Sequence, residues 1–117
     1  IPALVALLSS NDDKTRQNAA GAVSNYVRNG GSLCKQLVAD GAVEAMVKVV
    51  RSESLALRKL GLLTIGSFCA YEECRVRLLQ IGFEDTLSQI EAAREGEPDP
   101  SIAYHISRIK QRLSQHK

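Results

Sequence analysis

Few side chains in this sequence are of the types that carry out catalysis or bind metals. The two histidines, His105 and His116, stand near the C-terminal end, and neither belongs to a zinc-protease, nucleophile-elbow or clustered-carboxylate pattern. The three cysteines, Cys34, Cys69 and Cys74, form no CxxC pair and have no histidine at zinc-finger spacing. The sequence therefore predicts no catalytic residue, no metal site and no cofactor, and His105 is expected at a surface or an interface.

The number of cysteines indicates the redox environment of the protein. An odd number of cysteines makes a poor disulfide framework, and free cysteine is among the most buried residue types. We therefore expect three buried or half-buried thiols and a reducing, cytoplasmic location for the protein.

The composition excludes several classes of function. The chain has 117 residues with 15 basic and 13 acidic side chains, a net charge of +2. This weak charge gives no reason to expect nucleic acid or an anionic membrane as partner, and no run approaches the roughly 18 apolar residues of a bilayer span. Aromatic residues are only 4% and tryptophan is absent, so aliphatic and small side chains must fill the core. Because the chain begins with Ile1-Pro2, we expect an excised C-terminal part of a longer protein.

The elements that position these residues are predicted by an internal repeat. Residues 1–8 resemble residues 43–50, and a further copy begins at Gly82. In the same phase, residues 22–27 align with residues 64–69. Self-similarity at a period of about 40 residues is typical of armadillo or HEAT-type solenoids.

The predicted fold is therefore all-α, an armadillo/HEAT-like right-handed helical solenoid of about two and two-thirds three-helix repeats. We expect one domain over residues 1–117, with repeat pieces 1–29, 30–70 and 71–117.

Three long helices should form the third helix of each repeat. The first is predicted from near Asn11 to Arg28, with acidic residues in its first turn. The second should follow a cap at Ser52 or Ser54 and run to about Cys69. The last should start within residues 98–101, where Asp99 or Ser101 can cap it and proline is tolerated.

Shorter helices should connect the long ones. Residues 32–39 carry apolar side chains on one face, with Ser32 as the expected N-cap and Gly41 as a left-handed C′ residue. A second short helix is expected over residues 42–51, and residues 91–100, rich in acid, proline and glycine, should form a solvated loop.

Three glycines lie inside the predicted helices, at Gly21, Gly61 and Gly66. Each costs about 0.5–1 kcal/mol relative to alanine, so we expect each to allow close approach of a neighbouring helix. A phosphate-binding loop is excluded because the run from Gly61 to Gly66 lacks the lysine and the preceding strand.

The last helix is basic, with Arg108, Lys110, Arg112 and Lys117 and no acid after residue 100. Two readings are open: the cations offset the dipole of their own helix, which we favour, or they bind an acidic partner.

The first long helix resembles an armadillo repeat in the run NAAGAVSNYV, residues 18–27. The resemblance implies that Asn25 lies in the concave groove and hydrogen-bonds the backbone of an extended peptide. A carboxamide suits this role because it both donates and accepts. We expect a stripe of five partner-binding residues on the concave side of the long helices: Asn18, Asn25, Ser67, Tyr104 and Arg108. The alternative is that these are ordinary solvated helix faces.

An importin-like adaptor for localisation-signal peptides is the second function to consider. In such repeats the asparagine recurs, whereas the equivalents of Asn25 here are Ser67 and Arg108. The position that is often tryptophan in importin-type repeats is occupied by Gly21, Leu63 and then Tyr104, which argues against this alternative.

A closer resemblance covers nearly the whole chain. The runs NAAGAVSNYVRNGGSLC, ADGAVEAMVKVV, SFCAYEECR and SIAYHISRI resemble the C-terminal armadillo repeats of Fused-family serine/threonine kinases. The resemblance implies a kinase domain elsewhere in the parent protein and a non-catalytic scaffold here. It also implies roles in ciliary axonemes, Hedgehog signalling or the plant phragmoplast, association with the cilium or cytoskeleton, and kinesin-type partners.

The N-terminal end is predicted to expose an apolar surface. Ile1, Leu4, Val5 and Leu8 belong to a first helix pair with no preceding repeat in this chain. We therefore expect an uncovered apolar side there and self-association of the isolated chain.

Overall fold

The computed structural model describes residues 1–29, 32–93 and 99–115, and all the regular secondary structure in these ranges is α-helical. Part of the expected acidic loop, residues 94–98, lies outside the described residues, as do Gly30, Gly31, His116 and Lys117. The helices are α1 (Pro2–Leu7), α2 (Asp13–Arg28), α3 (Cys34–Ala39), α4 (Ala42–Val50), α5 (Leu55–Phe68), α6 (Glu72–Gln80), α7 (Phe83–Ala93) and α8 (Pro100–Gln115).

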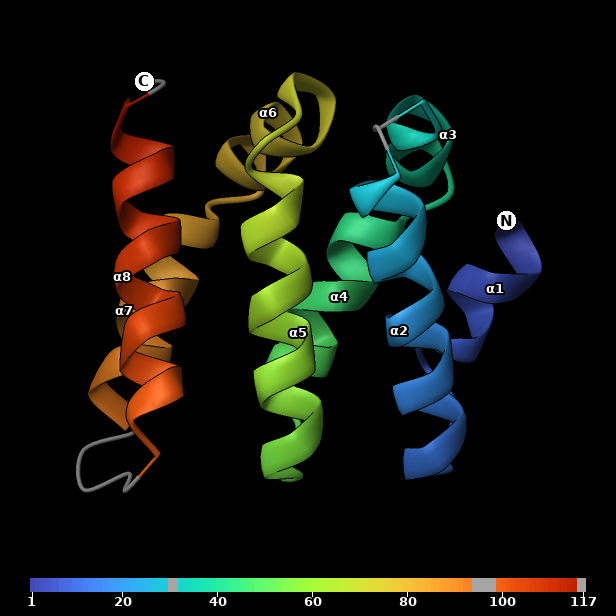
Figure 1. The fold of residues 1–117 in the computed structure, drawn as a ribbon, viewed down its shortest axis with the longest axis horizontal. Helices are drawn as coiled ribbons and strands as arrows, with labels where there is room; N and C mark the ends of the chain where they lie inside the picture. The colour runs from blue at the N-terminus through green and yellow to red at the C-terminus, as the bar shows by residue number, and fades with distance from the viewer. Residues whose placement is uncertain (30–31, 94–98, 116–117) are drawn as a thin grey trace.

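The long helices form one layer of a helical solenoid. In Figure 1, α2, α5 and α8 run nearly parallel and side by side, with α4 and α7 behind them and α3 and α6 at one end of the layer. The packing contacts agree, because α5 touches α2, α4 and α8, and α3 touches α6. The predicted armadillo/HEAT-like solenoid is confirmed, and each long helix is positioned by its neighbours in the stack.

Side-chain caps define where the long helices begin. Asp12 accepts a hydrogen bond from the main-chain N–H of Thr15 at 3.0 Å and caps α2. Ser54 caps α5, and Asp99 accepts the N–H of Ser101 at 2.9 Å at the start of α8. The predicted starts of the long helices are therefore confirmed, with Ser54 and Asp99 as the caps.

The structure differs from the prediction in two places outside the long helices. α3 begins at Cys34 after Leu33, with no side-chain cap, so Ser32 stands one residue too early and its predicted capping role was wrong. Gly41 does follow α3 with a φ of 83°, as predicted, and Gly82 occupies the same place after α6 with a φ of 73°. The prediction of a loop from residue 91 was also wrong at its start, because α7 continues to Ala93.

The three glycines inside the long helices pack in different ways. A Cβ on Gly61 would lie 2.8 Å from Cγ2 of Val50, so this glycine does allow α4 and α5 to approach closely. A Cβ on Gly66 would lie 3.4 Å from Nη1 of Arg108, which is a contact with a side chain. Nothing lies within 4 Å of the corresponding position on Gly21, so the prediction of close packing there was wrong.

The core consists mainly of aliphatic side chains with Phe68 and Phe83 as its largest members. Cys34, Cys69 and Cys74 are free and buried, as predicted. Burial raises the pKa of the Cys69 thiol to about 11. Burial also raises the pKa of Cys74, whose neighbour is the Cys34 thiol on the adjacent short helix. These thiols are packing groups and stay protonated at neutral pH.

The N-terminal helix is covered better than predicted. Val5 is only 7% exposed and Leu8 only 2%, because their side of α1 packs against α2 and the core. Ile1 and Leu4 are partly buried against the same core. The expectation that Val5 and Leu8 are uncovered was wrong; the large apolar side chain that α1 does expose is Leu7, at 46%.

Candidate partner-binding face

The layer of α2, α5 and α8 turns one side toward its neighbours in the core and the other side outward (Figure 1). We call this outward side the long-helix face. Asn18 and Asn25 are exposed on α2, seven residues apart and thus on the same side of the helix. Tyr104 on α8 is 64% exposed. Within the described residues, neither asparagine side chain forms a hydrogen bond, so both carboxamides are available for a partner.

Ser67 and Arg108 are more engaged than the other three predicted residues. The Ser67 hydroxyl donates to the carbonyl of Leu63 at 3.3 Å, so its hydrogen is already used inside α5. Arg108 is half-buried, with its guanidinium against Gly66. No hydrogen bond or ion pair joins any two of the five predicted residues in the part of the chain that the structure describes. The five therefore occupy the three long helices without forming one cluster.

Three arginines gather at the C-terminal end of α5. Arg112 donates from Nη1 to the carbonyl of Gly66 at 2.8 Å, and Arg75 donates from Nη1 to the carbonyl of Cys69 at 3.1 Å. Arg108 lies against Gly66 beside them. We call Arg75, Arg108 and Arg112 the arginine cluster. Arg112 stands in the last turn of α8, the place from which the favoured expectation has it offset the dipole of its own helix, and its donor also reaches a carbonyl of α5.

The neighbouring cations on these helices have carboxylate partners. Lys59 pairs with Asp99 at 3.0 Å, and Lys110 pairs with Glu91. Across residues 1–29, 32–93 and 99–115, no carboxylate forms an ion pair with any member of the arginine cluster. The cluster is therefore a local excess of positive charge that the net charge of +2 does not reveal.

His105 lies beside this face. Its ring packs edge-on to Tyr104 with centroids 5.7 Å apart, and its Nδ1 is buried without a hydrogen-bond partner in the described structure. Burial, followed by the charges of Arg108 and Lys59, lowers the pKa of His105, so the imidazole is neutral at pH 7. The described residues contain no group of side chains arranged to hold a metal ion.

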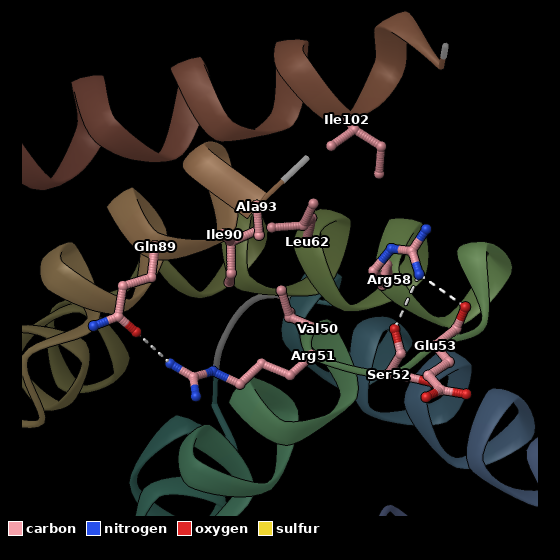
Figure 2. Close-up of a pocket in the computed structure, with 10 residues that line it drawn as sticks. All are labelled: Val50, Arg51, Ser52, Glu53, Arg58, Leu62, Gln89, Ile90, Ala93 and Ile102. Carbon is pink, nitrogen blue, oxygen red and sulfur yellow. Dashed lines mark hydrogen bonds between the residues drawn. The ribbon is translucent and has the colours of Figure 1, made fainter. Parts of the chain in front are cut away.

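A pocket of about 530 Å³ opens at the other end of the long helices (Figure 2). On one side, Arg51 donates to Oε1 of Gln89 at 3.0 Å, which links the end of α4 to α7. Arg58 donates to the carbonyls of Ser52 and Glu53 at 3.1 and 2.8 Å. The apolar wall consists of Val50, Leu62, Ile90, Ala93 and Ile102.

None of the five predicted site residues lines this pocket. Sequence reasoning missed it because Arg51 and Gln89 are 38 residues apart and belong to no motif. Arg75 was missed in the same way. Arg112 had one usable signal, its spacing of four residues from Arg108 on a helix without acidic residues after Asp99.

Comparison with known proteins agrees with the geometry. A model of the Armadillo/beta-catenin-like repeat matches residues 1–28. The serine/threonine-protein kinase TIO of Arabidopsis thaliana is 30% identical over 122 residues, covering 92% of this chain and 9% of the kinase. The crystal structure of an engineered protein superposes with a TM-score of 0.82 at 18% identity, over 97% of this chain and 46% of that one.

Residues 1–28 thus match an armadillo repeat, and the likeness to the solved structure shows the helical-repeat fold over most of the chain. Repeats of this type present extended surfaces to protein partners. The chain spans only 9% of the length of the similar kinase, so that protein's activity is not transferred with the likeness. No helix in the described ranges combines the length and the apolar character that a membrane crossing requires.

Proposed function

We propose that this chain is a non-catalytic protein-interaction scaffold whose long-helix face binds an extended segment of a protein partner. The observation that supports the proposal most directly is the alignment of α2, α5 and α8 side by side (Figure 1). Asn18 and Asn25 on α2 and Tyr104 on α8 are exposed on these helices. An extended segment crossing the layer would meet each long helix in turn.

Each predicted residue has a definite role in this proposal. The Asn18 and Asn25 carboxamides would bond the N–H and C=O groups of the segment, and the exposed Tyr104 ring would cover an apolar side chain. Ser67 would act only as an acceptor because its hydrogen is bonded to Leu63. Arg108 would supply charge at the α8 end of the face.

The parent protein is a finer part of the proposal. We infer a Fused-like serine/threonine kinase with a kinase domain elsewhere in its chain, supported by the 30% identity to kinase TIO over 92% of this chain. Ciliary, microtubule-linked or Hedgehog-type signalling, a cytoplasmic location and kinesin-type partners follow from that inference. The test is the sequence of the full gene: a glycine-rich loop with HRD and DFG motifs would support it, and their absence would remove it.

The binding test uses peptides selected from a random display library on the purified chain. The double variant Asn25→Ala/Tyr104→Ala should weaken binding by fluorescence anisotropy by about tenfold or more, since it removes both a backbone bridge and an aromatic contact. Ser88→Ala, an exposed position on α7, is the matched control. Circular dichroism checks that each variant is folded. Unchanged affinity in the folded double variant would end the proposal.

A basic localisation-signal peptide separates this function from the adaptor alternative. Because the arginine cluster places unpaired positive charge beside α5, we expect no binding of such a peptide at micromolar concentration. Micromolar binding would favour the importin-like adaptor.

A further inference from the structure

We propose that the arginine cluster is the receptor for an acidic stretch, rich in aspartate and glutamate, in the partner segment. This inference rests on the proposed function and adds the chemistry of the partner to it. The cluster lies where α5 ends between α6 and α8, on the same end of the layer as Asn25 on α2. A segment that runs from the C-terminal end of α2 to that of α8 passes the C-terminal end of α5 (Figure 1), where two of the arginines are bonded.

The three charges are close together. Nη1 of Arg108 lies 3.4 Å from the point where a Cβ on Gly66 would stand, and Arg112 bonds the carbonyl of Gly66. Arg75 bonds the carbonyl of Cys69, three residues further along the chain. All three guanidinium charges act on the Cys69 thiol. Like charges gathered this closely repel one another, so an anion between them would lower the energy of the site.

The helix that they cap does not neutralise them. The C-terminus of a helix carries roughly half a negative charge, whereas the cluster brings three positive ones. The acidic residues nearest in sequence, Glu72 and Glu73, form no ion pair with the cluster within the described structure. Glu73 instead acts on Cys34 and Cys74, on the α3 side.

Most of the donors in the cluster are unused. A guanidinium carries five N–H groups, yet Arg75 and Arg112 each make one hydrogen bond to a carbonyl and Arg108 makes none among the described residues. The carbonyl bonds hold two of the guanidiniums in place, which reduces the entropy lost when they bind. Arginine pairs with carboxylates through two parallel hydrogen bonds, so the free edges suit aspartate and glutamate side chains.

The test compares three fluorescent peptides of equal length: one alternating glutamate with alanine, its glutamine counterpart and its lysine counterpart. We expect binding of the glutamate peptide alone, weakening as salt rises from about 0.05 to about 0.3 M because the charges are partly exposed. The variant Arg108→Gln/Arg112→Gln should weaken that binding by about tenfold or more. Lys14→Gln/Lys48→Gln removes the same charge from two exposed lysines elsewhere and should change it little.

Further variants separate a recognition role from a purely structural one. Because Arg112 bonds the carbonyl of Gly66, replacing Arg112 also changes the stability of the fold. Arg108→Gln alone removes no such bond and should still weaken the binding of the acidic peptide. Equal binding of the glutamate and glutamine peptides, no binding of the glutamate peptide at millimolar concentration, or an equal effect of the lysine control would each overturn the inference. A phosphoserine peptide that binds more tightly than the glutamate peptide would overturn the choice of occupant.

Two different results would distinguish failure of this inference from failure of the proposed function. If library-selected neutral peptides bind in an Asn25-dependent way and the arginine variants do not change the affinity for acidic peptides, the long-helix face binds partners but the cluster does not recognise acidic residues. If acidic peptides need the arginines but not Asn25 or Tyr104, the cluster stands and the roles proposed for Asn25 on α2 and Tyr104 on α8 fail.

Discussion

At the scale of single residues, the two buried glycines of α5 have different neighbours. Gly61 faces the backbone and side chain of Val50, whereas Gly66 faces the flexible end of Arg108. Gly61→Ala should lower the free energy of unfolding by about 1–3 kcal/mol through overpacking. Gly66→Ala should keep or raise it, by up to about 1 kcal/mol, because alanine favours the helix. Urea denaturation measures both, and a loss at residue 66 as large as at residue 61 would contradict this packing.

The shifted pKa of Asp99 gives a prediction about the stability of the fold at acidic pH. Hydrogen bonds from Ser101, followed by the interaction with Lys59, lower the pKa of Asp99 from 3.8 to about 2. The folded state therefore binds this proton less readily than the unfolded state, so the stabilisation is present above pH 4 and is lost between about pH 4 and pH 2. Asp99→Asn should flatten that part of the curve of melting temperature against pH. An unchanged acid slope in this variant would show that other carboxylates dominate.

At the scale of helices, capping separates the residues that start a helix from those that merely precede one. Ser54→Ala should lower the free energy of unfolding by about 1 kcal/mol, because the Ser54 hydroxyl accepts the N–H of Leu57 at 3.3 Å. Ser32→Ala, at the position that sequence suggested as a cap, should have no effect because α3 has no side-chain cap. Thermal denaturation of the two variants compares them, and equal losses would contradict the assigned start of α3.

The same scale shows how far sequence reasoning reaches. The repeat and its caps predict α2, α4, α5 and α8 because a cap and an apolar period act within one helix. Contacts between repeats, such as Arg112 with Gly66 at a separation of 46 residues, depend on how far each repeat rotates relative to the last. That rotation has no local pattern, so the arginine cluster and the pocket at Arg51 could be found only in the structure.

At the scale of the whole molecule, the apolar surface at the α1 end bears on self-association. Leu7 is 46% exposed there, and α1 has α2 as its main packing neighbour. We expect the isolated chain to associate weakly at high concentration and Leu7→Gln to reduce the association, since burial of a leucine contributes about 2 kcal/mol. Leu55→Gln, at a leucine 38% exposed on α5, is the control. Sedimentation that shows a strict monomer, or equal effects of the two variants, would contradict it.

The position of α5 between α2 and α8 has a mechanical consequence. A helix that is packed on both sides can be pulled away only after one of its neighbours has moved, whereas α1 and α8 lie at the two ends of the stack (Figure 1). Under tension applied across the stack, the chain should peel from its ends inward and release α5 last. A scaffold that links two cellular structures would then yield in steps, and each step would absorb work before α5 is released.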